Sequence, residues 1–514
     1  MEKTRGHWLG RWVEPKTQVE EGRKLFSDRD LKALILPLFV EQALAMLVGV
    51  ADTLMVSYAG EAAVSGVSLV NMVNTLFIYL FTALASGGAV VVSQYLGRGD
   101  KKEGDGASCQ LYAVTFLFSL AVAALMLLFH RQLLGLLFRQ TEPVVMEAGV
   151  TYLRILALSY PALALYNAGA ALYRSMGRTK TTMKVSLCMN VINTGGNAIG
   201  IFVLHAGVAG VAWPSTISWY FAAVVMTALC FQKKNQARIA WRGLFSWDSA
   251  MVRRILGIAV PNGIENGLFQ LAKVALSTIT ALFGTSQIAA NGVAQSIWSL
   301  AALVGAALGP AFITVVGRCM GAGDPEAADY YMKKLLRLTF LISVGWNALV
   351  LLLTPALLLC YDLEPGTKQL VLWLVVIHNI ANAVAYPVSG PFSNGLRAAG
   401  DVKFTMYASL FATLVCRVSL SVVFGIWLDL GVIGVALAMV CDWCIKAALL
   451  LARYRAGKWK ALRVLGEATA PAVLDSRGPY FPQWGKYGPL AALFTRFPPD
   501  FAQREHSRPQ TAIL

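Results

Sequence analysis

Runs of about twenty apolar residues recur along almost the whole chain, and each is long enough to cross a hydrocarbon core of about 30 Å as a helix. With 57% hydrophobic and only 14% charged residues, a chain of 514 residues cannot bury this much apolar surface in a soluble core. A bilayer is therefore the expected solvent, and helices satisfy their own backbone there. We place twelve spans at residues 31–55, 64–90, 107–129, 148–173, 181–204, 208–231, 254–282, 288–315, 333–360, 368–394, 403–427 and 431–453.

The basic residues of the loops give the orientation of these spans. Nineteen Lys and Arg residues lie in or beside the loops that follow even-numbered spans, against four for the loops that follow odd-numbered spans. Because basic loops stay in the cytoplasm, both termini are predicted to be cytoplasmic in a multi-pass protein of the cell membrane. The net charge of +16 is then a topology signal, and no nucleic-acid partner is expected. Ser27 followed by Asp30 resembles a capping box that begins the first span.

The two halves of the chain match each other at an offset of 224 residues. Pro37 and Glu41 fall on Pro261 and Glu265 at this offset, and a shift of one residue brings Arg174 onto Arg397. Each repeat holds an even number of spans, so both halves enter the membrane with the same orientation. The predicted fold is an all-α integral membrane protein whose two six-helix repeats are related by a pseudo-twofold axis near the membrane normal.

Five segments follow from this organisation. They are a cytoplasmic N-terminal segment (1–30), an N-terminal six-helix bundle (31–231), a cytoplasmic linker (232–253), a C-terminal six-helix bundle (254–463) and a cytoplasmic tail (464–514). The tail is rich in Pro, Gly and mixed polar residues, has no counterpart in the first half, and is predicted to be disordered.

The sequence carries no motif for enzymatic chemistry. It has no phosphate-binding loop, no hydrolase nucleophile motif and no spacing typical of a metal site, so we expect no catalytic residue, no metal and no cofactor. Two equivalent halves with a cleft between them predict a transporter that moves a solute by rocking one half against the other. Because no ATP-binding loop is present, its energy must come from an ion gradient, with H⁺ or Na⁺ as the coupling ion.

Ionisable residues inside spans are the first candidates for function, because a charge at the bilayer centre costs about 2.5–3.5 kcal/mol. The ion-coupling candidates are Asp52, Glu41 and Glu265. Glu41 and Asp52 are eleven residues apart, which places them on nearly the same face of one helix. Two plainer readings stay open: Glu41 as an inter-helix hydrogen-bonding group, and Asp52 as a cap of the helix end.

Polar side chains gather on one face of the fifth span and on one face of the seventh. Such faces either line a cavity or hold helices together by hydrogen bonds. The candidate cavity residues are Gln42, Asn71, Asn190, Asn193, Asn197, Asn262, Asn266, Gln270, Lys273 and His378, with Asn74 beside Asn71. Arg417, Asp442 and Lys446 are expected to form a structural charge cluster.

Several strings of the sequence together resemble one transporter family. They are Pro37 to Thr53, Gly60 to Gly66, Ser93 to Gly97, Pro261 to Asn266, Arg397 to Asp401, and Asp442–Trp443. Over residues 27–463 the chain resembles the multidrug and toxic compound extrusion (MATE) transporters, which belong to a larger group with polysaccharide and lipid flippases.

The resemblance implies a secondary antiporter that expels organic, usually cationic, compounds by alternating access in exchange for protons or sodium. Asp52 matches the family's first-span aspartate, and Glu265 is similar to a seventh-span acid that some members use for sodium. Those members also use a tenth-span aspartate, where this chain offers His378, Asn379 and Asn382, so protons are the favoured ion. The expected partners are the bilayer and small organic cations, and the chain is expected to be a monomer.

A flippase for a lipid-linked saccharide or another anionic lipid is the alternative within the same group. It requires a cationic cleft, which Lys273 and Arg417 favour and which Glu41, Asp52 and Glu265 oppose.

Overall fold

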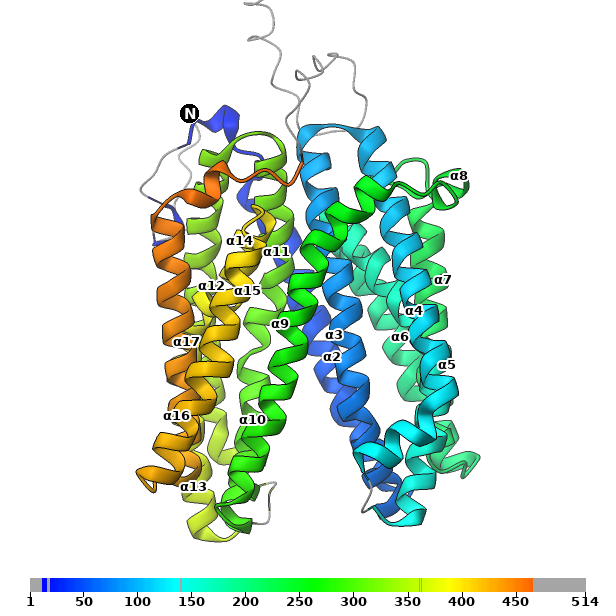
Figure 1. The fold of residues 1–514 in the computed structure, drawn as a ribbon, viewed down its shortest axis with the longest axis vertical. Helices are drawn as coiled ribbons and strands as arrows, with labels where there is room; N and C mark the ends of the chain where they lie inside the picture. Colours follow the sequence, from blue (N-terminus) through cyan, green and yellow to red (C-terminus); the bar gives the residue numbers. More distant parts are fainter. Residues whose placement is uncertain (1–11, 16–18, 139–140, 360, 362, 466–514) are drawn as a thin grey trace, which may run out of the picture.

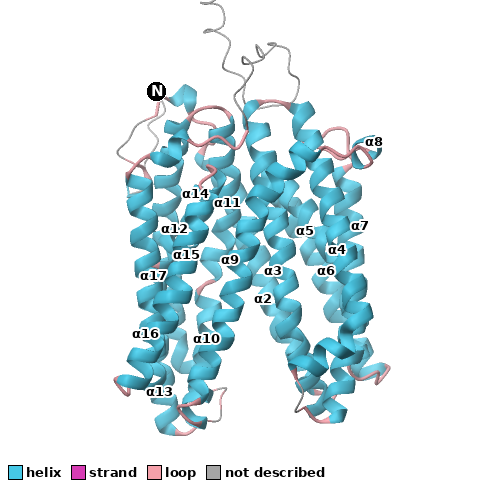
Figure 2. Ribbon diagram, in the orientation of Figure 1, coloured by secondary structure: helices cyan, strands magenta, loops and turns pink. Residues whose placement is uncertain are grey.

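The computed structural model describes residues 12–15, 19–138, 141–359, 361 and 363–465. Two bundles of long helices lie side by side, packed together at the end that holds residues 12–26 and diverging toward the other end (Figure 1). The described residues form helices and connecting loops, with no strand among them (Figure 2). The fold predicted from the sequence is confirmed in class, whereas the tail predicted beyond residue 465 lies outside the described residues.

The first bundle, called the N-lobe, holds six spans. They are α2 (Asp28–Ser57), α3 (Glu61–Arg98), α4 (Lys101–Leu137), α5 (Pro143–Ser175), α6 (Thr179–Ala198) with the π-helical turn η2 (Ile199–Val203), and α7 (Ala209–Cys230). A short turn, η1 (Glu21–Arg23), precedes the lobe, and the short helix α8 (Trp241–Leu244) lies in the linker that follows it.

The second bundle, called the C-lobe, also holds six spans, several of them in pieces. They are α9 (Ser249–Ala281); α10 (Thr285–Ala301) with α11 (Leu303–Gly321); α12 (Pro325–Leu358); α13 (Pro365–Val384) with η3 (Val388–Phe392) and α14 (Ser393–Ala398); α15 (Val402–Leu410) with η4 (Phe411–Arg417), α16 (Val418–Val422) and η5 (Val423–Trp427); and α17 (Gly431–Arg455). The turn η6 (Lys458–Ala461) follows.

The first span begins where the sequence predicts. The Ser27 hydroxyl accepts a hydrogen bond from the Asp30 N–H, and the Asp30 carboxylate accepts one from the Ser27 N–H. This reciprocal capping box satisfies two of the backbone donors that a helix start leaves without partners.

The breaks in the C-lobe have identifiable causes. The Trp346 indole N–H of α12 donates to the Leu300 carbonyl at 2.9 Å, just before α10 gives way to α11. In the tenth span, Pro387 and Pro391 lack the N–H that would continue the helical ladder, and the chain forms the π-helical η3 at that point. Both breaks depend on local or tertiary features that hydropathy does not report.

Ten helical segments are long and apolar enough to cross a bilayer by length and composition. The two remaining spans, α6 and α9, are not among them. These are the helices that carry the asparagine face and the polar face found in the sequence. Their polar side chains lower the hydropathy of spans whose length is otherwise sufficient. The helix α6 packs on α2 and α7 within the N-lobe, whereas α9 packs on α3 of the N-lobe as well as on α15 of its own lobe.

The lobes meet where α3 crosses α11, at two glycines that occupy equivalent positions in the repeats. A Cβ on Gly97 would lie 2.0 Å from the Arg318 carbonyl oxygen, and a Cβ on Gly321 would lie 1.9 Å from the Gln94 carbonyl oxygen. At the offset of 224 residues Gly97 is equivalent to Gly321 and Gln94 is equivalent to Arg318, so the two contacts are related by a twofold axis through the crossing. Only a residue without a side chain permits this backbone approach.

The crossing is reinforced by hydrogen bonds between the lobes. Arg318 donates to the Ser175 carbonyl through both Nε and a terminal nitrogen at 3.0 and 2.7 Å, and the Gln94 amide donates to the Ala398 carbonyl at 2.7 Å. We call the end of the molecule where Gly97 of α3 and Gly321 of α11 meet the closed end. Buried polar groups are satisfied here across the interface, and not within either lobe alone.

The segment that precedes α2 also joins the lobes, because it packs on α12 of the C-lobe. Arg23 makes a two-pronged contact with Asp324 at 2.9 and 2.6 Å, and Glu14 pairs with Lys334 at 2.7 Å. Partial burial opposes ionisation of Asp324, but hydrogen bonds from Arg23 and the Ala327 N–H outweigh it and lower the pKa of this carboxyl. The contact is therefore intact at neutral pH and is lost only as the pH falls through that lowered pKa.

We expect Gly97→Ala to destabilise the closed end, because the new methyl group has backbone on its far side and cannot be accommodated by a rotamer change. The cost should be about 1–3 kcal/mol, typical of overpacking. Thermal unfolding of the purified protein in detergent measures it. Gly257→Ala is the matched control, because a Cβ there meets nothing within 4 Å and alanine favours the helix. Equal melting temperatures for the two variants would contradict a tight crossing.

Candidate functional site: a polar cavity in the N-lobe

The N-lobe encloses a cavity of about 400 Å³ between α2, α3, α5, α6 and α7. Its polar lining comes from every one of these helices: Asp52, Thr53, Ser68, Asn71, Asn74, Tyr152, Ser159, Asn190, Asn193, Ser215, Ser218 and Trp219. Asp52 is the one charged side chain among the described residues that line it. The cavity therefore offers one carboxylate among neutral hydrogen-bonding groups.

Asp52 is held by a chain of amide and hydroxyl groups. The Asn197 amide donates to the Asp52 carboxylate at 2.6 Å and to the Asn193 amide oxygen at 3.1 Å, and the Asn193 amide donates to the Ser215 hydroxyl at 2.9 Å. No Lys, Arg or His nitrogen lies within 4.0 Å of Asp52 in the described part of the chain. This carboxylate is thus oriented by one neutral donor, the Asn197 amide, and has no cationic partner among the described residues.

Glu41 occupies a different environment, although it shares the α6-facing side of α2. It is 4% exposed and pairs with Arg174 of α5 at 2.5 Å, while the Thr182 hydroxyl of α6 donates to its other oxygen at 3.1 Å. Tyr166 donates a longer hydrogen bond of 3.5 Å. A carboxylate with these partners is compensated within the N-lobe.

Glu265 repeats this arrangement in the C-lobe. Arg397 donates to Glu265 at 2.5 Å, and Lys446 lies 3.3 Å from its other oxygen. The sequence places Lys446 in a charge cluster with Arg417 and Asp442, and it predicts no role for Arg397 beside Glu265. The signal was present in the repeat register, which matches Glu41 with Glu265 and Arg174 with Arg397. The geometry within one lobe therefore predicts the geometry within the other.

The other C-lobe candidates do not converge on one cavity in the described residues. Arg417 and Asp442 lie 3.8 Å apart, as expected for a charge cluster, whereas Lys446 pairs with Glu265. Asn266 donates a 3.5 Å hydrogen bond to Asn262. The buried amide nitrogen of Gln270 and both ring nitrogens of the buried His378 have no hydrogen-bond partner among the described groups. Gln42 is half-buried on α2 next to Glu41.

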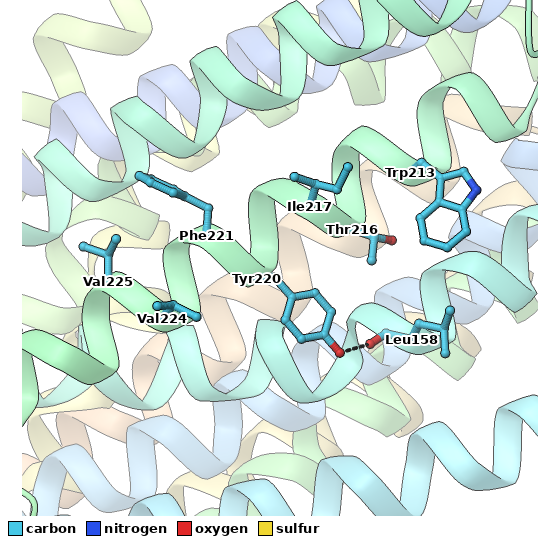
Figure 3. Close-up of a pocket in the computed structure, with 8 residues that line it drawn as sticks. All are labelled: Leu158, Trp213, Thr216, Ile217, Tyr220, Phe221, Val224 and Val225. Atoms are coloured by element: carbon cyan, nitrogen blue, oxygen red, sulfur yellow. Dashed lines mark hydrogen bonds between the residues drawn. The ribbon is translucent and has the colours of Figure 1, made fainter.

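A larger hollow of about 740 Å³ lies elsewhere on the N-lobe, along α7 and beside Leu158 of α5 (Figure 3). Its side chains are almost wholly apolar, and Trp213, Ile217 and Val224 are largely exposed. The Tyr220 hydroxyl is occupied by a hydrogen bond to the Leu158 carbonyl at 2.9 Å. With no charged group in its lining, this surface suits lipid chains and offers nothing for ion coupling.

Sequence reasoning did not single out Tyr152, Ser215 and Trp219, which also line the cavity. Serine and aromatic residues are frequent in transmembrane helices for packing reasons, so they give no distinctive signal. Only the placement of α5 and α7 around Asp52 brings these residues to the site.

Comparison with known proteins relates the chain to membrane transporters. The MatE family model matches it twice, over residues 37–199 and 261–423, so the two matches begin 224 residues apart. The chain is 27% identical over 436 residues to the uncharacterized transporter YisQ of Bacillus subtilis, covering 84% of this chain and 94% of that one. It is 24% identical to the probable multidrug resistance protein NorM of Thermotoga maritima, covering 88% and 96% of the two chains.

Solved structures share the fold. A transporter of the MOP superfamily from Pyrococcus furiosus superposes with a TM-score of 0.79 at 19% identity, over 87% of this chain and all of that one. A multidrug resistance MATE transporter in an outward-facing conformation gives the same score at 19% identity, over 90% of this chain. At these identities the likeness establishes the architecture of two six-helix lobes.

We expect Arg174→Gln to destabilise the protein by about 3–5 kcal/mol, because it leaves the buried Glu41 carboxylate without its cation. The double variant Glu41→Gln/Arg174→Gln should recover part of this loss, which unfolding measurements in detergent detect as non-additivity. Arg131→Gln, in the exposed pair with Glu147, should cost no more than about 1 kcal/mol. Strictly additive effects at positions 41 and 174 would show that the two side chains are not coupled.

Proposed function

Because this chain belongs to the MatE family of membrane transporters, we propose that it is a secondary antiporter that exports organic cations in exchange for protons by alternating access. The observation that carries the proposal is the state of Asp52, a carboxylate in a polar cavity with no cationic side chain beside it. The names of its relatives, which include probable multidrug resistance proteins and multidrug and toxin extrusion proteins, support an organic cargo.

One carboxylate is sufficient for exchange. Asp52 binds a proton when the cavity is open to the side of high proton concentration, and it then offers no charge to a cation. On the other side it releases the proton and attracts the cationic cargo. Each occupant excludes the other, because both use the same negative charge, so the two move in opposite directions. Asn197 keeps the carboxylate oriented in either state, since an amide is both a donor and an acceptor.

The contacts of the other two acids support protons over sodium. Glu41 and Glu265 are each held by an arginine at 2.5 Å, and Glu265 has Lys446 in addition. A sodium ion at either acid would have to displace or approach these cations. The two acids therefore serve the cohesion of each lobe, and Asp52 is left as the coupling group.

The closed end is the cytoplasmic end in this proposal, because the loops that gather there carry the basic residues. The diverging end then faces outward, and the Gly97 and Gly321 crossing is the contact that separates when the lobes rock to the inward-open state. The cargo enters from the bilayer or the cytoplasm as a small organic cation, with the protein acting as a monomer in the cell membrane. An anionic lipid is a poorer cargo for this cavity, since its phosphate would meet Asp52.

The test is transport into proteoliposomes with an imposed pH or sodium gradient and ethidium as the cationic probe. A gradient of one pH unit supplies about 1.4 kcal/mol and should sustain about a tenfold dye ratio for one-for-one exchange. A sodium gradient alone should sustain none. Asp52→Asn should abolish the pH-driven accumulation, because an amide neither binds a proton nor attracts a cation.

Glu61→Gln is the matched control, since it removes an exposed carboxylate at the same end of the N-lobe and should leave accumulation unchanged. Accumulation that persists in Asp52→Asn at the wild-type level would refute Asp52 as the coupling group. Accumulation driven by sodium and not by protons would overturn the choice of ion.

A further inference from the structure

The linker between the lobes presents three large aromatic side chains on its surface. Trp241, Phe245 and Trp247 are close together in the sequence and are 67%, 85% and 55% exposed. The short helix α8, which begins at Trp241, lies on the outer side of the N-lobe at the level where the spans of that lobe end (Figure 1). Exposed apolar side chains gathered in this way mark an interaction surface.

This part of the linker is held in place by the N-lobe. Asp105 of α4 accepts a hydrogen bond from the Arg238 N–H at 2.8 Å and pairs with the Arg238 guanidinium at 3.3 Å. The Gln110 amide of α4 donates a hydrogen bond to the Ser246 carbonyl. Contacts before and after α8 therefore fix its position, and the outward direction of the aromatic side chains is part of the fold.

The aromatic side chains continue the apolar surface of α7. The Trp241 ring stacks on Phe231, the residue that directly follows α7, with the ring centres 4.9 Å apart. Further along α7, Val224 and Ile217 are largely exposed on the surface shown in Figure 3. Because α7 spans the bilayer, this surface suits acyl chains. Trp241 then lies at the end of the span, where acyl chains give way to headgroups.

The linker also carries a strong positive charge. Residues 232–253 hold five basic residues and one acid, Asp248, which accepts hydrogen bonds from backbone N–H groups at the start of α9. Arg238 is paired with Asp105. The other four basic residues are exposed and have no carboxylate oxygen within 4.0 Å among the described residues: Lys233, Lys234, Arg242 and Arg253. A basic cluster of this size directly beside a span is typical of segments that bind anionic lipid.

We propose that the linker is a docking surface for anionic phospholipid of the cytoplasmic leaflet. Trp241, Phe245 and Trp247 insert at the boundary between headgroups and acyl chains, where aromatic side chains are favoured, and the four cations face the lipid phosphates. Each cation near an anionic surface adds about a fivefold gain in affinity. This inference goes beyond the transport function and uses only the orientation that places the closed end in the cytoplasm.

The test measures quenching of the linker tryptophans by brominated lipids. The full-length protein is placed in phosphatidylcholine nanodiscs that contain either brominated phosphatidylglycerol or the same fraction of brominated phosphatidylcholine. Subtracting the fluorescence of the Trp241→Phe/Trp247→Phe variant isolates the linker signal. Quenching by the anionic lipid should exceed quenching by the neutral lipid by about twofold or more. Salt at about 1 M should reduce this difference, because it screens charges beyond about 3 Å.

Three charge variants separate the cations from the aromatic side chains. Lys233→Gln/Lys234→Gln should lower the preference for phosphatidylglycerol and leave quenching by phosphatidylcholine unchanged, because the aromatic side chains remain. Lys233→Arg/Lys234→Arg keeps both charges and should retain the preference. Lys403→Gln/Lys458→Gln removes two exposed lysines of the C-lobe and is the matched control, which should behave as the wild type does. Each variant is compared with its own version that lacks the two linker tryptophans.

The outcomes that would overturn the proposal are distinct. Equal quenching by the two lipids in the wild type, or an equal loss of preference in the C-lobe control, would reject an anionic-lipid surface on the linker. Quenching by neither lipid would also reject it and would assign the aromatic side chains to a soluble partner instead. The assay involves no transport, so its result is independent of the proposed exchange of cations for protons.

Discussion

Charge compensation inside the bilayer is the constraint on which the rest of this structure depends. Each lobe carries a glutamate at the same helix position, buried at Glu41 and mostly buried at Glu265, and neutralises it with an arginine from the fourth span of the same repeat, at 2.5 Å in both cases. Such a pair is costly to bury and far more costly to break, so it fixes how the first and fourth spans of each lobe pack. Against these balanced pairs, the acids and bases that lack a partner are informative. Asp52 in the N-lobe and Lys273 in the C-lobe are two such residues, because neither has an oppositely charged side chain within 4.0 Å among the described residues.

The proposed alternating access requires an interface between the lobes that is tight and yet can separate. At the α3–α11 crossing the closest contacts, at Gly97 and Gly321, are made by backbone atoms, so no large side chain has to be withdrawn at these two positions. The hydrogen bonds that reinforce it run from Gln94 and Arg318 to carbonyl groups of the other lobe, and water can replace them when the closed end opens. The segment before α2 adds the Arg23–Asp324 contact at the rim, where solvent screens its charge.

The sequence predicted the features that depend only on the spacing of residues within one helix. Apolar runs predicted the spans, the Ser27–Asp30 pair predicted the first helix start, and the spacing of Asn190, Asn193 and Asn197 predicted a polar face on α6. Contacts between helices could be predicted less well from the sequence. The break at Leu300 depends on Trp346 of another span, and Ser215 joins the Asp52 network only because α7 packs beside α6. The Glu265–Arg397 pair could have been predicted in part. Once the Glu41–Arg174 pair is known, the alignment of the two repeats places Arg397 beside Glu265.

Comparing the two repeats distinguishes residues that occur in both lobes from residues that occur in one lobe only. In the register that matches Pro37 with Pro261 and Glu41 with Glu265, Asp52 falls on Leu276 and Lys273 falls on Gly49. The prolines and the glutamates occur in both lobes, as expected for residues that shape any such bundle. Asp52 occurs only in the N-lobe and Lys273 only in the C-lobe, and their charges have opposite signs. The two lobes therefore share one arrangement of helices but differ in the sign of the charge that each leaves without an ionic partner among the described residues.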